Sequence, residues 1–155
     1  MTSSSGYPDF TVVGVDPGKT TGIFVFQWWE SGRSVVHRDE WDWQMFCQRM
    51  PHMLEHSKCP DLVVVERFII TQRTAKLSAQ SEPLDVIGAL KFLCFVNGVE
   101  LAVQSKSNTV HHGSDEQLSA AGWRHPGLRH ANDAARHVAH AVAVRRPDIY
   151  QKLMM

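Results

Sequence analysis

Two apolar runs flank a tight Pro-Gly turn near the start of the chain, and this segment restricts the fold more than any other. The runs Phe10–Asp16 and Thr20–Trp29 are rich in the β-branched and aromatic residues that favour strands. Pro17 and Gly18 stand between them and favour a sharp reversal of the chain. The segment therefore predicts two antiparallel strands joined by a short turn.

Two of the predicted strands end in a carboxylate. Asp16 closes the first run, and Glu66 closes residues 61–66, a short continuous apolar run typical of a strand buried on both faces. A charge at the tip of a buried strand costs free energy unless a cation or a hydrogen-bond donor satisfies it. Asp16 and Glu66 are therefore the first candidate functional residues.

The remaining chain alternates between strands and helices. A third strand is expected over residues 34–37 and a fifth over residues 99–103. Helices are expected over residues 41–56, with Asp42 placed to cap the helix and Pro51 to kink or split it, residues 83–97, ended by Gly98, residues 114–123, and residues 130–146, ended by Pro147.

This order predicts an α/β fold. Three strands in an antiparallel meander, followed by βα units, give a five-stranded mixed sheet in which the fourth and fifth strands are parallel, with helices on both faces. A length of 155 residues suits one domain. We expect residues 1–8 to form a disordered lead and residues 9–150 a single domain.

Composition restricts the partner and the compartment. The net charge is zero, but residues 1–66 carry about −4 and residues 67–155 about +4, which mildly favours an acidic partner for the second half. The three cysteines form no CxxC pair, which favours reduced thiols in a cytosol. No run approaches the roughly 18 apolar residues of a membrane helix, and the N-terminus lacks the pattern of a signal peptide. We therefore expect a cytoplasmic protein with no membrane partner.

The predicted sheet brings charged side chains to one edge. Asp16 and Glu66 end neighbouring central strands, where ligands of open α/β sheets usually bind. His130 and Asp133 share one face at the start of the last helix and can complete a site of three carboxylates and one imidazole. Hard oxygen ligands without cysteine favour Mg²⁺ or Mn²⁺, and such sites hold two ions about 4 Å apart that act on phosphodiesters.

Three segments carry a specific resemblance. Residues 13–18 (VGVDPG), residues 63–66 (VVVE) and residues 130–135 (HANDAA) resemble the acidic motifs of RuvC-type Holliday junction resolvases, members of the RNase H-like nuclease superfamily, and the phage-encoded members most closely. The resemblance implies a homodimeric endonuclease that uses Mg²⁺ or Mn²⁺ to cut four-way DNA junctions. Its catalytic and metal-binding residues would be Asp16, Glu66, His130 and Asp133, and its location the cytosol of a bacterium or a phage-infected host.

Segments outside the motifs fit this interpretation. In similar resolvases the loop after Glu66 contacts the junction, and here it carries four residues with the required chemistry: Arg67, Phe68, Arg73 and Lys76. Phe68 is placed either to wedge into the junction or to fill the core. Lys106 is a further candidate DNA contact. The helix over residues 83–97 is apolar around much of its surface, which favours burial on two sides, one of them against a dimer partner.

Other interpretations remain open or are excluded. Residues 14–20 resemble a phosphate-binding loop, but the spacing is one residue short and a strand follows, so we exclude it. The same residues also resemble the phosphate loop of the actin/sugar-kinase superfamily, which makes an ATP-binding phosphotransferase domain an alternative. A catalytically inactive DNA-binding module of the same fold is another. We interpret His137 and His140 as surface or packing residues.

Overall fold

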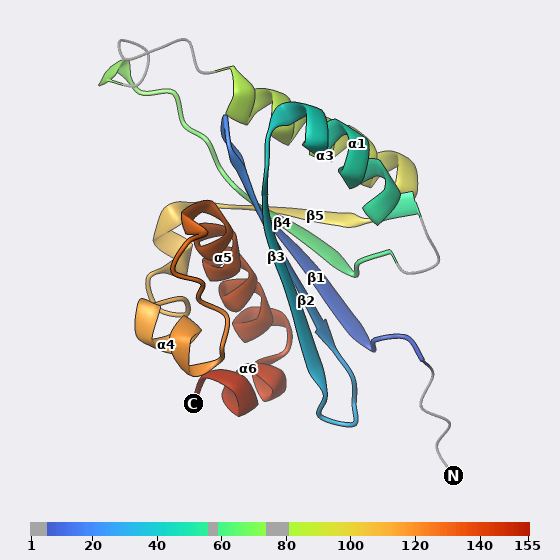
Figure 1. Ribbon diagram of the computed structural model, residues 1–155, viewed down its shortest axis with the longest axis vertical. Helices are drawn as coiled ribbons and strands as arrows, with labels where there is room; N and C mark the ends of the chain where they lie inside the picture. Colours follow the sequence, from blue (N-terminus) through green and yellow to red (C-terminus); the bar gives the residue numbers. More distant parts are fainter. Residues whose placement is uncertain (1–5, 56–58, 74–80) are drawn as a thin grey trace.

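The structure, a computed structural model, describes residues 6–55, 59–73 and 81–155. Figure 1 shows a central sheet with helices on both of its faces. The elements are β1 (Phe10–Asp16), β2 (Thr21–Trp28), β3 (Ser34–Trp41), α1 (Trp43–Glu55), β4 (Leu62–Glu66), α3 (Glu82–Asn97), β5 (Glu100–Gln104), the 3₁₀ turn η1 (Lys106–Thr109), α4 (Asp115–Ala120), α5 (Arg129–Arg145) and α6 (Pro147–Met154).

The sheet has the predicted five-stranded mixed arrangement. Its strand order is β3-β2-β1-β4-β5; β1 pairs antiparallel with β2 and β2 with β3, whereas β1–β4 and β4–β5 are parallel. Val15 lies opposite Val65 in the β1–β4 ladder. Asp16 and Glu66 therefore follow paired residues at the carboxyl ends of two neighbouring parallel strands.

Alternating side chains of the central strands build two cores. Val12 and Val64 face α4, α5 and α6, together with Phe24 and Phe26 of β2. Val13, Val15, Val63 and Val65 face α1 and α3 on the opposite side of the sheet. Because helices cover both faces of the sheet, nearly every residue of the central strands is apolar, and the strands appear as continuous apolar runs in the sequence.

Two glycines allow α5 to approach the sheet closely. A Cβ atom added at Gly22 would lie 2.0 Å from the carbonyl oxygen of His130. One added at Gly14 would lie 2.6 Å from the carbonyl oxygen of Ala134. Any larger residue at either position would push the helix outward, so these glycines place the first turns of α5 against the strands that carry the carboxylates.

Several element boundaries differ from the expectations; α4, for example, ends at Ala120 and not near residue 123. The third strand continues to Trp41, four residues beyond the expected end, and Asp42 caps α1 by accepting a hydrogen bond from the Met45 backbone N–H at 2.8 Å. Helix α1 runs through Pro51 without being split. Pro147 ends α5 as expected but also begins α6, which suits its fixed φ and missing N–H. Among the described residues, no helix combines the length and apolarity that crossing a membrane requires.

Candidate active site

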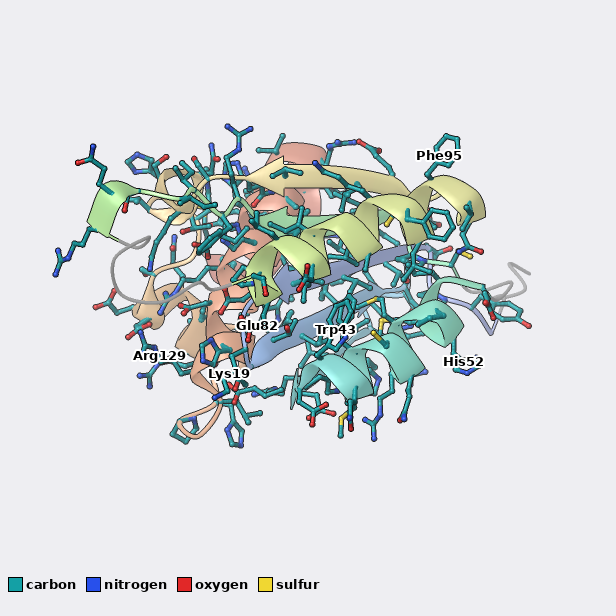
Figure 2. The ribbon with its side chains drawn as sticks, turned by 90° about the horizontal axis from the view of Figure 1, so that it is seen from above. Lys19, Trp43, His52, Glu82, Phe95 and Arg129 are labelled. Atoms are coloured by element: carbon teal, nitrogen blue, oxygen red, sulfur yellow. The ribbon has the colours of Figure 1, made fainter. Side chains whose placement is uncertain are left out.

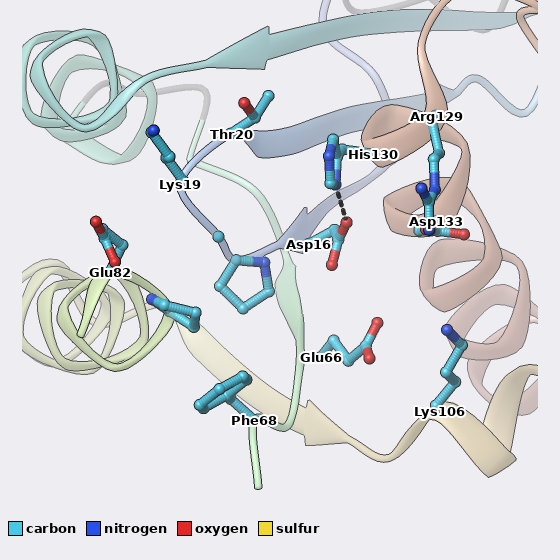
Figure 3. A pocket seen from close by; sticks show the side chains of 13 residues that line it. Asp16, Lys19, Thr20, Glu66, Phe68, Glu82, Lys106, Arg129, His130 and Asp133 are labelled. Carbon is cyan, nitrogen blue, oxygen red and sulfur yellow. Dashed lines mark hydrogen bonds and ion pairs between the residues drawn. The ribbon is translucent and has the colours of Figure 1, made fainter. Parts of the chain in front are cut away.

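A cavity of about 660 Å³ opens at the carboxyl ends of β1 and β4. It is lined by all four residues that the sequence nominated for catalysis: Asp16 from β1, Glu66 from β4, and His130 and Asp133 from α5. Figure 3 shows these side chains around the cavity, on segments that lie far apart in the sequence. The structure therefore brings the predicted residues together, and their chemical roles stay predictions.

Asp16 is the most buried of these carboxylates, with a side chain 14% exposed. Its pKa is raised to about 6, mainly by burial and also by the negative charges of Glu66 and Asp133, while a hydrogen bond from His130 acts in the opposite direction. A bound cation would offset both the desolvation and the repulsion. The environment of Asp16 therefore fits a cation-binding carboxylate.

His130 is held at both its backbone and its side chain. Its backbone N–H donates to Glu40 Oε1 of β3 at 2.8 Å, which satisfies one of the free donors at the start of α5. Its Nδ1 lies 2.9 Å from Asp16 Oδ2 (Figure 3). Because an ionised carboxylate can only accept, Nδ1 carries the proton in this contact.

Glu66 is paired with a histidine that we interpreted from the sequence as a surface or packing residue. The His137 ring is only 1% exposed; its Nε2 lies 3.1 Å from Glu66 Oε2, and its Nδ1 lies 2.9 Å from Gln104 Oε1. The hydrogen bond from His137 is the main reason why the pKa of Glu66 is lowered. The sequence did contain a signal, because His137 lies four residues after Asp133 on the same helical face.

Asp133 is another carboxylate of the cavity and has a basic partner on its own helix. Arg136 Nε lies 3.4 Å from Asp133 Oδ1. The same guanidinium donates to the carbonyl oxygen of Gly113 and to Asp115 Oδ1, which fixes its position. Arg136 is a second residue near the site that the sequence reasoning missed.

The donor set fits the metal that the motifs imply. The cavity lining holds the carboxylates of Asp16, Glu66 and Asp133, a fourth from Glu82 at the start of α3, and the imidazole of His130, which is the oxygen-rich chemistry that Mg²⁺ and Mn²⁺ prefer. Within residues 6–55, 59–73 and 81–155, no three His, Cys, Asp or Glu side chains converge on a common point that could hold a metal ion. The Asp16–His130 and Glu66–His137 contacts instead pair each of these carboxylates with an imidazole.

The predicted DNA-binding residues lie at different places around the cavity. Phe68 and Lys106 line it, and the charge of Lys106 also lowers the pKa of Glu66. Arg67, directly after β4, and Arg73, in a helical turn further along, are both exposed and lie outside the cavity lining. Lys76 lies outside the described residues.

The loop after β4 also carries Ile69 and Ile70, two apolar side chains that we did not single out from the sequence. Phe68 is half-buried and packs against the core that faces α1 and α3. Ile69 and Ile70, by contrast, are 62% and 60% exposed. On this loop, Ile69 and Ile70 therefore expose more apolar surface than Phe68 does.

Comparison of the sequence with protein-family models and with curated proteins finds no match. Solved structures, however, resemble the fold. RuvC of Thermus thermophilus matches with a TM-score of 0.66 and 18% identity over 89% of this chain and 97% of that chain. A Holliday junction resolvase of fowlpox virus matches with a TM-score of 0.56 and 13% identity over 87% of this chain and 99% of that chain. The yeast mitochondrial Holliday junction resolvase matches with a TM-score of 0.53 and 13% identity over 97% of this chain and 87% of that chain. The chain thus has the RuvC-type, RNase H-like fold that its motifs predict, while a particular likeness to phage-encoded members stays a prediction.

Proposed function

We propose that this protein is a metal-dependent endonuclease that resolves four-way DNA junctions. One observation carries the proposal: Asp16, Glu66 and Asp133 open on one cavity, in a fold shared with Holliday junction resolvases. Three carboxylates in one cavity repel one another, and a bound cation would offset that electrostatic cost.

Asp16, Glu66 and Asp133 would hold Mg²⁺ or Mn²⁺, two ions per site, with His130 as a further ligand or a helper of the attacking water. Such ions lower the pKa of bound water and stabilise the leaving oxygen of a phosphodiester. His137 keeps Glu66 ionised and oriented. With Nδ1 of His130 donating to Asp16, Nε2 is the ring nitrogen left to bind a metal ion or to accept a proton from an attacking water.

The DNA contacts would surround this cavity. Lys106 would bind phosphate beside Glu66, and the cationic loop residues Arg67, Arg73 and Lys76 would bind the junction arms. The apolar wedge would come from the same loop. Phe68 is one candidate for it, and its exposed neighbour Ile69 is the other.

The two wedge candidates can be separated by mutation. Phe68→Ala removes a side chain that packs on the core, so any loss of cutting should come with a loss of stability. Ile69→Ala removes an exposed side chain, so a wedge there would lose cutting with the melting temperature unchanged. Unaltered cutting by both variants would remove the wedge from the proposal.

Resolution also requires two cuts on opposed strands, and therefore two active sites. Helix α3 supports a homodimer because it is apolar on both sides: Val86, Ile87 and Leu90 are buried in the core, whereas Phe92 and Phe95 are 65% and 85% exposed. Figure 2 shows Phe95 projecting outward from the helix. A second copy placed on this face would bury the exposed rings.

The direct test is cleavage of a synthetic four-way junction in Mg²⁺ or Mn²⁺, with linear duplex of the same sequence as the substrate control. Asp16→Asn and Glu66→Gln should abolish cutting, while Glu100→Gln, which changes an exposed carboxylate on β5, should leave it intact. Full activity of Asp16→Asn or Glu66→Gln would overturn the assignment. ATP turnover would point to the kinase-like alternative, and junction binding without cleavage in either metal to an inactive module.

A further inference from the structure

A second, smaller cavity adjoins the candidate active site along α5. It has a volume of about 240 Å³ and lies between the start of α5, the loop before it and the start of α4. Arg129 and Asp133 line both cavities, so the two spaces meet at these residues. Figure 3 shows Arg129 and Asp133 together on α5 at the side of the active-site cavity.

Three arginines line the smaller cavity, and two of them are already paired. Arg136 is bound to Asp115 and Asp133, and Arg124 lies 3.6 Å from Asp115. In the part of the chain that the structure describes, no carboxylate lies within ion-pair distance of Arg129, whose side chain is exposed. Arg129 is therefore the cation of this cavity that remains available to a ligand.

The loop that shapes this cavity is firmly held. Asn132 accepts a hydrogen bond from the His125 backbone N–H at 2.9 Å and donates to the His125 carbonyl at 2.8 Å. The Arg38 guanidinium of β3 donates to the carbonyl of Gly122 at 3.1 Å. Trp123 is buried against Phe24 and Phe26. The backbone that carries Arg124 and Arg129 is thus fixed before any ligand arrives, which reduces the entropic cost of binding.

We propose that Arg129, flanked by Arg124 and Arg136, forms a phosphate subsite that binds the nucleic-acid backbone next to the Asp16–Glu66–Asp133 cavity. This proposal rests on the proposed function, because it assumes that a nucleic-acid strand passes through the active site. A guanidinium can bind a phosphate group through two parallel N–H donors. A nucleic-acid strand with one phosphate at the carboxylates has further phosphates on either side, and one of these would reach Arg129. The loop after β4 would bind the strand on one side, and Arg129 on the other.

The subsite is tested by measuring binding of a fluorescein-labelled four-way junction in EDTA over a range of NaCl concentrations. Arg129→Gln should weaken binding about tenfold at fixed salt, since a charge-assisted hydrogen bond is lost. It should also reduce the slope of log affinity against log salt by about 0.9, the value for one duplex phosphate contact. Arg129→Lys should retain the slope because it retains the charge.

Arg33→Gln is the matched control. Arg33 stacks on Trp29 in the β2–β3 turn, at the opposite end of the strands from Asp16. The Arg33→Gln substitution removes the same charge as Arg129→Gln, but it should leave both the affinity for the junction and its salt slope unchanged. Equal losses in the two variants would show a general charge effect and overturn the subsite. Thermal unfolding of Arg129→Gln should match the wild type, because its side chain is exposed and forms no ion pair with the described residues.

The remaining outcomes separate the subsite from the proposed function. If the wild type cuts junctions and Arg129→Gln keeps full affinity and slope, the subsite is wrong and the nuclease assignment stands. If the wild type binds junctions without cutting them in Mg²⁺ or Mn²⁺ and Arg129→Gln shows the reduced salt slope, the subsite stands and the nuclease assignment fails. A wild type that does not bind the junction at all would overturn both.

Discussion

Replacing Asp16 by asparagine should stabilise the metal-free protein while abolishing its activity. Asp16 has a pKa of about 6 in the folded protein, against 3.8 for an unperturbed aspartate. The folded state therefore holds this proton more tightly than the unfolded state between these pH values, so stability falls as pH rises through this window. At 1.36 kcal/mol per pKa unit, the difference amounts to about 3 kcal/mol at neutral pH.

Asparagine keeps the shape of the side chain and a hydrogen-bond acceptor for His130 Nδ1, but it carries no charge to desolvate. Asp16→Asn should therefore be more stable than the wild type by up to about 3 kcal/mol at pH 7.5 in EDTA. For a chain of this length, the melting temperature would rise by about 6–12 °C. The difference should shrink as pH falls and vanish below about pH 4.

The measurement is urea unfolding of both proteins, followed by tryptophan fluorescence from pH 4 to pH 8 in EDTA. Adding Mg²⁺ or Mn²⁺ should then stabilise the wild type by about 2.7 kcal/mol at one hundred times the dissociation constant, and leave Asp16→Asn unchanged. The reasoning is refuted if Asp16→Asn is no more stable than the wild type at pH 7.5 in EDTA. A difference that does not depend on pH would refute the electrostatic origin of the effect.

Three further changes test the surroundings of Asp16. Glu66→Gln should change the stability in the opposite direction from Asp16→Asn, so that urea unfolding at pH 7 shows a less stable variant. The reason is that the folded-state pKa of Glu66 is lowered, so its charge stabilises the fold above its unfolded pKa, and this stability is lost as pH falls. His137→Phe keeps a ring of similar volume but removes the hydrogen bond to Glu66, so an NMR titration of the Glu66 carboxyl should show a higher pKa than in the wild type; an unchanged value would exclude His137 as its cause. Gly22→Ala would place a Cβ 2.0 Å from the His130 carbonyl oxygen and should cost about 3 kcal/mol or more, whereas Gly88→Ala, where nothing lies within 4 Å, should stabilise α3 by about 0.5–1 kcal/mol; equal effects in thermal melts would contradict the close approach of α5.

The sheet could be predicted from the sequence because its signals are local. Continuous β-branched runs mark strands buried on both faces, and the rules for connecting them leave few arrangements, so the strand order placed Asp16 beside Glu66. The third strand was expected to end at residue 37, because the residues after it are polar. Those side chains have partners far away in the chain: Arg38 donates to Gly122, and Glu40 accepts from His130. A local sequence pattern cannot predict hydrogen bonds between residues so far apart in the chain.

The same limit explains which site residues were found and which were missed. Asp16, Glu66 and Asp133 lie within recognisable motifs, so they were nominated from the sequence alone. His137 and Arg136 act through side-chain contacts that depend on how α5 crosses the sheet. The helical period places both close to the face of Asp133, but it does not say which strand end that face will meet. Only the packed structure supplies that information.

Asp16, Glu66 and Asp133 each have a hydrogen-bonding partner on the same helix, α5. The pairs are Asp16 with His130, Glu66 with His137, and Asp133 with Arg136. Because all three partners belong to α5, the position of this helix sets the geometry and the charge balance of the whole site. That position depends in turn on Gly14 and Gly22, which allow α5 to lie against β1 and β2. The glycines beside the Pro-Gly turn and the acidic residues are therefore parts of one arrangement: without the small residues in the strands, the helix could not reach the carboxylates that it holds in place.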